Sequence, residues 1–354
     1  MKRFFLAALA IAAIASCTKN EVVSPENQSQ EITFQTVVGP ATKALDPATQ
    51  VKFDEANKFY SYAFFLPQGK NWDADYASAQ NYITQSLIED TVPAADDYSW
   101  KNASATYYWP KQGSLTFFAW TDNTSNPTVS GSSTAILCEN NTGIQVLNYS
   151  VTDNPNKDMM VAAVAKDKTA NENQYVTSGV PTLFSHILSQ LEFYVKTKED
   201  YSTSATFALK SLNLKNVYVD GDYTQGSPTA SITPWNGYTT QNNIPVYNPA
   251  SPTEVTLTSG TTALAPNTGD YYIVLPQTFA DAIPVIEVVY TITTNYTGTP
   301  VVETVTVEKD LKTIYTDWEP GKTHQLTITL SLDEILWDPA TVEWVTDNTP
   351  AVTL

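Results

Sequence analysis

The feature that most constrains the fold is a repeated two-residue alternation of apolar and polar side chains. It is clearest from Leu326 to Leu332, where Leu or Ile occupies every second position and Thr or Ser the positions between. Because successive side chains of a strand point to opposite faces, this pattern predicts a strand with one buried face and one face in water. The other strand-like runs lie at 31–38, 58–66, 105–109, 114–120, 143–151, 159–165, 191–196, 212–219, 271–275 and 283–292. An all-β protein is therefore predicted.

The composition indicates a folded protein and argues against one class of partner. The chain holds 13 Phe, 20 Tyr and 8 Trp, which a disordered acidic chain would lack. Lys and Arg number 19 against 37 Asp and Glu, for a net charge of −18. A nucleic-acid binder needs a basic patch to displace counterions from phosphate, so no nucleic-acid partner is expected. One stretch, 72–89, has the pattern of a helix instead of a strand.

The strand patterns fall into two blocks. A length of 354 residues is typical of two domains, and the polar stretch 166–179 separates the blocks. We therefore predict an N-terminal domain over 44–179 and a C-terminal domain over 180–354. The segment before them, 17–43, reads as a polar tether followed by one strand.

The first residues have the pattern of an export signal. Two basic residues precede an apolar run at 4–14, which is too short to span a bilayer as a helix. The run ends in Ile-Ala-Ser-Cys at 14–17, which resembles a bacterial lipobox. Residues 1–16 are thus predicted to be a lipoprotein signal peptide and Cys17 the lipidated N-terminus. The alternative is an ordinary signal peptide with an incidental Cys. If Cys17 is acylated, Cys138 has no partner for an intramolecular disulfide.

Motifs for catalysis or for a bound cofactor are missing from the sequence. It has no Gly-x-Ser-x-Gly, no phosphate-binding loop, no His-Glu-x-x-His and no Cys-x-x-Cys. His186 lies in an apolar strand-like segment and is interpreted as a structural residue, and His324 as a surface or edge residue. Acidic pairs such as Asp220 and Asp222 are interpreted as solvated turns, because calcium needs 6–8 oxygen ligands. No enzyme, no metal site and no cofactor are expected.

Six short strings occur along the chain in a fixed order. They are Tyr-Tyr-Trp-Pro at 107–110, Leu-Thr-Phe-Phe-Ala-Trp at 115–120, Lys-Asp-Met-Met-Val-Ala at 157–162, the segment 183–193, Trp-Glu-Pro-Gly-Lys at 318–322, and the segment 337–344. Together with the lipobox, this ordered combination resembles the fimbrillin-like proteins of Bacteroidales, which are subunits of type V pili. This family usually has Tyr where this chain has His324.

This resemblance implies a fold, a location and a set of partners. The fold would be two transthyretin-like antiparallel β-sandwich domains in series. The chain would be exported as an outer-membrane lipoprotein through Cys17 and would end in a cell-surface fimbria that supports adhesion and biofilm. Its partners would be other pilus subunits, the outer-membrane lipid that anchors it before maturation, a trypsin-like surface protease and an unidentified surface ligand.

The resemblance also implies a maturation step at a basic residue. Lys43, before Ala44, is the only Lys or Arg between Lys19 and Lys52. A cut there would release the preceding strand, with its apolar residues Ile32, Phe34 and Val38, and open an apolar groove in the N-terminal domain. Residues 17–43 would thus be a propeptide, and a donor strand from another subunit would fill the groove.

The donor strand is expected at the C-terminal end, within 340–354. The apolar residues that alternate in this tail are Val342, Trp344, Val352 and Leu354. The alternative is a final strand that packs on its own domain.

A second function remains open from the sequence. A monomeric surface lipoprotein could present its aromatic side chains to polysaccharide. The aromatic residues in question are Tyr107, Trp109, Phe117 and Trp120, all of which lie in strand patterns. The mature N-terminus separates the two readings, since a pilus subunit released by cleavage would begin at Ala44.

Overall fold

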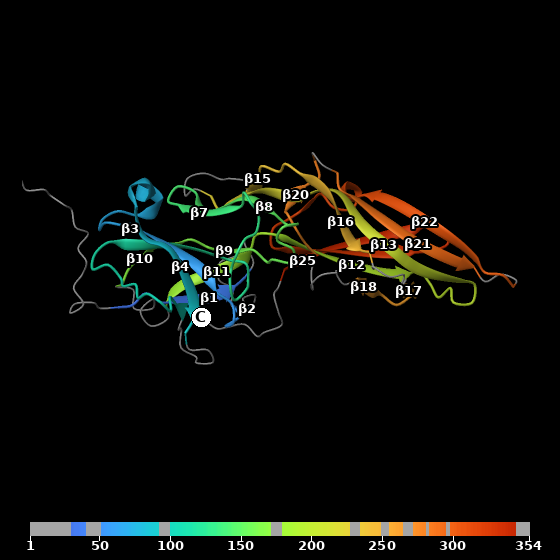
Figure 1. The fold of residues 1–354 in the computed structure, drawn as a ribbon, viewed down its shortest axis with the longest axis horizontal. Coiled ribbons are helices and arrows are strands. Elements are labelled where there is room, and N and C mark those ends of the chain that lie inside the picture. The colour runs from blue at the N-terminus through green and yellow to red at the C-terminus, as the bar shows by residue number, and fades with distance from the viewer. Residues whose placement is uncertain are drawn as a thin grey trace, which may run out of the picture.

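The structure is a computed structural model in which strands dominate, as the alternation predicts. It is elongated, with the N-terminal half of the chain at one end and most of the C-terminal half at the other (Figure 1). The residues that it describes are 30–39, 51–91, 100–170, 179–226, 234–248, 255–264, 272–280, 283–294 and 298–344. The all-β prediction is confirmed.

The N-terminal half contains a sheet that closes on itself. Its strands pair in the cycle β6–β3–β4–β5–β1–β11–β9 and back to β6, with β2 and β10 as branches. Closure leaves β1 with a neighbour on each side, and the ring surrounds one hydrophobic core. The strands are β1 (Phe34–Val38), β2 (Val51–Lys52), β3 (Phe59–Leu66), β4 (Gln80–Asp90), β5 (Trp100–Lys101), β6 (Ser114–Thr121), β9 (Met160–Ala162), β10 (Ala165–Lys168) and β11 (Val180–His186).

A second, smaller sheet covers one side of this ring. It consists of β7 (Ala135–Glu139), β8 (Gly143–Ser150), β14 (Asp220–Thr224) and β15 (Trp235–Asn236). Strand β6 lies between two cores, so every one of its residues is buried. Leu115 and Phe117 point into the ring, while Phe118 and Trp120 pack under the second sheet. Burial on both faces explains why β6 reads as a continuous apolar run.

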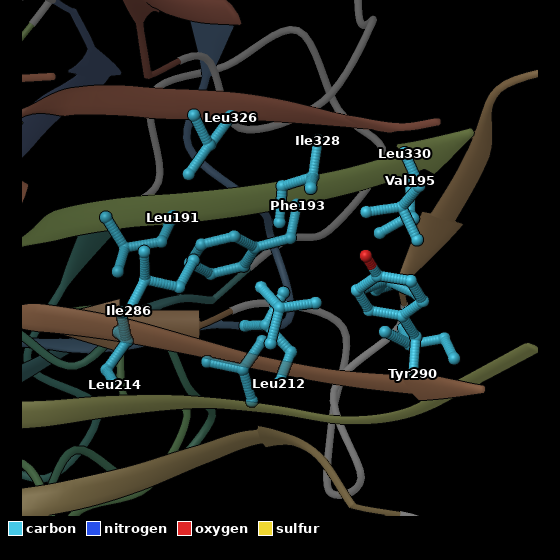
Figure 2. Close-up of a cluster of buried hydrophobic side chains, with 14 of the residues drawn as sticks. Leu191, Phe193, Val195, Leu212, Leu214, Ile286, Tyr290, Leu326, Ile328 and Leu330 are labelled. Carbon is cyan, nitrogen blue, oxygen red and sulfur yellow. The ribbon is translucent and has the colours of Figure 1, made fainter. Parts of the chain in front are cut away.

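Two further sheets pack face to face in the C-terminal half, and Figure 2 shows the side chains between them. One sheet joins β12 (Ser189–Thr197), β18 (Thr262–Leu264), β19 (Tyr272–Val274), β24 (Lys322–Leu330) and β25 (Ile335–Glu343). The other joins β13 (Ala205–Tyr218), β16 (Gln241–Tyr247), β17 (Val255–Leu257), β21 (Val285–Thr294) and β22 (Val301–Asp310). A short pair, β20 (Gln277–Thr278) with β23 (Asp317–Trp318), and the 3₁₀ turn η3 (Leu311–Thr313) complete the described elements.

The two halves are interleaved. Strand β11 pairs with β1 and β9, although the sequence assigned residues from 180 onward to the second domain. The polar stretch 166–179 thus connects two strands of one sheet, and the chain passes between the halves at Ile187 and Leu188. It returns once, because β14 pairs with β8 and β15 pairs with β14. Strand β14 also carries Asp220 and Asp222, which were predicted in solvated turns. The Asp222 carboxylate accepts the N–H of Asn148 in β8, and that of Asp220 accepts the N–H of Thr240, just before β16.

The prediction of a helix over 72–89 is wrong for most of that segment. Helix α1 spans only Trp72–Asp75 and is followed by the 3₁₀ turn η2 (Tyr76–Ser78), and β4 begins at Gln80. The β3–β4 pairing shifts register twice, so β4 lacks the strict two-residue alternation of a regular strand. Burial of Ile83 and Ile88 in the ring core decides the outcome, because tertiary packing overrides local propensity.

The ring core predicts a large stability loss for one aromatic truncation. Phe59 is fully buried and its ring lies within 6 Å of those of Phe34, Trp100 and Phe184. Phe59→Ala should lower the free energy of unfolding by about 3–5 kcal/mol, measured by urea denaturation. Val302→Ala is the control: Val302 is 61% exposed on β22, and its truncation should change the value by less than about 0.5 kcal/mol. Equal losses in the two variants would contradict this core assignment.

Candidate functional site

The candidate site is the position of β1 in the closed ring. Strand β1 runs parallel to β11 from the pair Phe34–Val180 to the pair Val38–Phe184. On its other side it pairs antiparallel with β5 and β2. Strand β1 therefore lies between β11, which follows almost 150 residues later, and the strands β5 and β2.

The side chains of β1 and the residues just before it fill the ring core. Ile32 and Phe34 are each 2% exposed and Val38 4%. The Phe34 ring meets Phe59 and Phe117 edge to face, each at a centroid distance of 5.7 Å. Burial of an aliphatic or Phe side chain contributes about 1.5–3 kcal/mol, so the three together contribute roughly 5–9 kcal/mol as an upper bound. Removal of β1 would leave an apolar slot of matching shape.

Backbone hydrogen bonds fasten both ends of this segment. The N–H of Ile32 donates to the carbonyl of Tyr107 at 2.8 Å, and that of Trp109 donates to Gln30 at 3.1 Å. At the other end, the N–H of Gly39 donates to the carbonyl of Phe184 at 2.9 Å. Departure of β1 would leave these donors and acceptors unpaired on two strand edges, and an incoming strand could satisfy them.

Gly179 is a residue of the site that sequence reasoning missed. Its φ is +78°, and a Cβ there would lie 2.7 Å from the carbonyl carbon of Phe34. Only glycine adopts this backbone so close to a neighbouring strand without strain. The available sequence signal is a glycine directly before the strand-like segment 180–188.

The C-terminal end of the described chain packs on its own subunit. Val342 lies in β25, opposite Thr323 of β24, and is 43% exposed. Trp344 is 6% exposed, and its ring stacks on that of His186 at a centroid distance of 4.1 Å. The other predicted positions, Cys17, Lys43, Ala44, Val352 and Leu354, lie outside the described residues.

His186 is buried, and its Nδ1 lies 2.6 Å from Oδ1 of Asp158. Among the described residues, no hydroxyl or thiol group forms a hydrogen bond with the His186 ring. Within the same ranges, no three His, Cys, Asp or Glu side chains gather as a metal ion would require. The described helices are also too short to cross a membrane.

His324 is not the surface or edge residue that the sequence predicted. It is 3% exposed, because β25 and the turn after β23 cover it. Its Nε2 accepts the N–H of Glu319 at 3.1 Å, and the Tyr315 ring meets it edge to face at 5.5 Å. Burial lowers the pKa of His324 to about 4, so the imidazole is neutral at pH 7.

Comparison with known proteins identifies the family. The sequence model described as fimbrillin-like matches residues 42–344, which is most of the chain. The chain belongs to the fimbrillin-like family. The resemblance seen in the sequence strings is thereby confirmed. Membership supports a structural or adhesive role at the cell surface, with other fimbrial subunits as partners, and it does not indicate an enzyme.

Several solved structures of bacterial proteins are similar to this chain, and one of them shows the same fold. A fimbrial protein of Bacteroides vulgatus superposes with a TM-score of 0.62 at 16% identity, over 90% of this chain and all of the other. A protein of Bacteroides uniformis proposed to act in cell adhesion gives 0.45 at 15% identity, over 91% and 100% of the two chains. The tip fimbrial protein Mfa3 of Porphyromonas gingivalis gives 0.36 at 10% identity, over 89% and 100%. A search of curated proteins gave no match.

The buried His324 predicts a dependence of stability on pH. Its pKa is about 4 in the folded chain against an ordinary 6.5, so the unfolded chain takes up the proton first as the pH falls. The contribution of the neutral ring to stability is therefore complete above pH 6.5. It is lost as the pH falls toward 4, by at most roughly 3 kcal/mol.

Chemical denaturation between pH 7 and 4 measures this loss, with His324→Gln as the control. Gln cannot titrate, and its amide oxygen can still accept the Glu319 N–H. The variant should show a shallower decline than the native protein. Parallel curves would show that His324 does not control this part of the pH dependence.

Proposed function

We propose that the protein is a subunit of a cell-surface fimbria that polymerises by replacement of β1. The observation that carries the proposal is the position of β1: a short strand near the start of the described chain completes a closed ring and its core. A strand that fits between two neighbours by pairing and by apolar side chains can be replaced by another strand that offers the same groups. The resemblance to type V pilus subunits gives the same role to this strand.

Cleavage after Lys43 would convert β1 from a covalent part of the fold into a bound peptide. Residues 40–50 connect β1 to β2, so a cut before Ala44 separates the two strands while β1 stays in its slot. The roughly 5–9 kcal/mol from the three buried side chains then holds β1 in place, together with the edge hydrogen bonds. A donor strand with comparable apolar residues competes for the slot on equal terms.

The proposal includes export and anchoring before maturation. Cys17 would carry the lipid in the outer membrane, and residues 18–29 would form a tether before the first described residue, Gln30. Twelve residues reach about 40 Å when fully extended. A trypsin-like surface protease would cut after Lys43 and free the subunit from its lipid. The two halves would correspond to two transthyretin-like sandwiches in series.

A sugar-binding surface draws no support from the aromatic residues. Trp109, Phe117 and Trp120 are each less than 5% exposed and belong to the cores. Stacking on a sugar ring needs an exposed aromatic face, so these residues hold the fold together instead.

The maturation step gives a direct test. Treatment of the purified precursor with a trypsin-like protease should yield a chain that begins at Ala44, identified by mass spectrometry, and ladders of polymers on non-boiled gels. Lys43→Gln should prevent both. Lys111→Gln, at an exposed position far from β1 in the sequence, is the control and should behave as the native chain. Polymers of equal yield from Lys43→Gln would refute cleavage at this site.

The strength with which β1 is held gives a second test. Phe34→Ala removes the ring that meets Phe59 and Phe117, so β1 should leave its slot faster after cleavage. We expect polymer formation to be at least tenfold faster, followed by light scattering after the protease is added. Gln35→Ala, at a half-buried position of the same strand, is the matched control with a small effect. An unchanged rate in Phe34→Ala would mean that β1 departure does not limit assembly.

A further inference from the structure

The C-terminal end of β25 is fastened to the N-terminal half of the molecule by Trp344. This residue directly follows β25, and its backbone N–H donates to the carbonyl of Gly321 at 3.1 Å. Its ring lies flat on the ring of His186, with 6° between the two planes. His186 is the last residue of β11, the strand that also pairs with β1. Trp344 thus packs against one end of the strand that lines the β1 slot.

His186, on which the Trp344 ring stacks, is held in place by residues that do not belong to β1. Nδ1 of His186 lies 2.6 Å from Asp158, and the other carboxylate oxygen of Asp158 accepts the side-chain amide of Asn123 at 3.2 Å. His186 also pairs with Met160 of β9. No hydrogen bond to Nε2 of His186 is found among the described residues, so Asp158 and the Trp344 face fix the ring. None of these contacts involves β1, and they can persist when β1 leaves.

Strand β25, which precedes Trp344, is also paired within its own subunit. Strand β25 pairs with β24 along its whole length, from Lys322–Glu343 to Leu330–Ile335. The first of these pairs is also an ion pair between the Lys322 ammonium and the Glu343 carboxylate. Donation of β25 to another subunit would require loss of this entire ladder and of the buried Trp344 ring. It would also expose β24 and the buried His324.

We propose that Trp344 is an anchor and that the donated strand is confined to residues 345–354. The proposal rests on the strand replacement proposed above and assigns Val342 and Trp344 to the donor's own subunit, with Val352 and Leu354 left as the apolar residues that enter the slot. Trp344 and His186 act as positioning residues, because they fix the point from which the donated segment leaves.

The length of this segment fits the role. Ten residues span about 33 Å when extended, and the segment from Ile32 to Val38 that fills the slot covers about 23 Å. About a third of the segment is therefore left to cross to the next subunit. Because Trp344 already fixes the start of the donated segment, only the residues after it have to be immobilised on binding. This lowers the conformational entropy that binding costs.

A disulfide that locks β25 to β24 tests the proposal. Lys322 and Glu343 face each other across the two strands and are partly exposed, so Lys322→Cys with Glu343→Cys places two thiols at cross-strand distance. Burial raises the pKa of the Cys138 thiol, which makes the native cysteine a slow competitor. Mass spectrometry verifies the bond before protease is added, and the reduced protein and the single variant Lys322→Cys are the controls.

The oxidised double variant should form ladders at the rate of its reduced form, because β25 never leaves β24. A block in the oxidised protein that reductant relieves would overturn the proposal and extend the donor into β25. Absence of ladders from the native chain would overturn the strand replacement itself, and the anchor with it.

Truncation and substitution at the anchor give an independent measurement. A chain that ends at Trp344 should keep the thermal midpoint of the native chain within about 2 °C, but as a matured subunit it should fail to donate a strand. In the full chain, Trp344→Ala should slow assembly at least fivefold, and Trp344→Phe, which keeps an aromatic face for His186, should restore most of the rate. Leu336→Ala, 43% exposed on the same strand, is the matched control. An unchanged rate in Trp344→Ala would refute the anchoring role.

Discussion

The N-terminal half of this molecule depends on one strand pairing, between β1 and β11. Without β1, the cycle of strands is open between β5 and β11, and the core loses Ile32, Phe34 and Val38. The pairing is parallel and joins residues nearly 150 positions apart, so its formation requires closure of a long loop. Strand β1 therefore both closes the ring and completes its core.

The junction between the halves is a packed core instead of a flexible linker. Ile187, Leu188, Trp235 and Leu275 belong to one hydrophobic cluster with residues of the ring and with Trp344. The buried side chain of Gln277 adds hydrogen bonds to both the N–H and the carbonyl of Tyr218, as a paired strand residue would. Such an interface resists bending, because any movement would open close-packed apolar surface. A subunit of a fibre benefits from this stiffness.

Burial also determines the state of the two histidines. Both are buried and contact one aromatic ring each. Asp158 and Trp344 hold His186, and Glu319, Thr341 and Tyr315 hold His324. These rings fill space in the cores and orient the groups around them.

The sequence by itself determined the fold class, the presence of an early strand at 31–38 and the family. Alternation of apolar and polar residues depends only on neighbouring positions, so strands such as β24 can be predicted directly from the printed letters. The ordered strings led to the fimbrillin-like family for the same reason, since each is local.

Only the tertiary structure decided which strands meet. It placed β11 in the ring, turned the expected helix at 72–89 into β4, buried His324 and set Trp344 on His186. Each of these outcomes depends on contacts between distant segments, and in each the apolar area buried by the distant contact outweighs local preference. The position of Gly179 against Phe34 shows the same limit, because its meaning appears only when the two strands lie side by side.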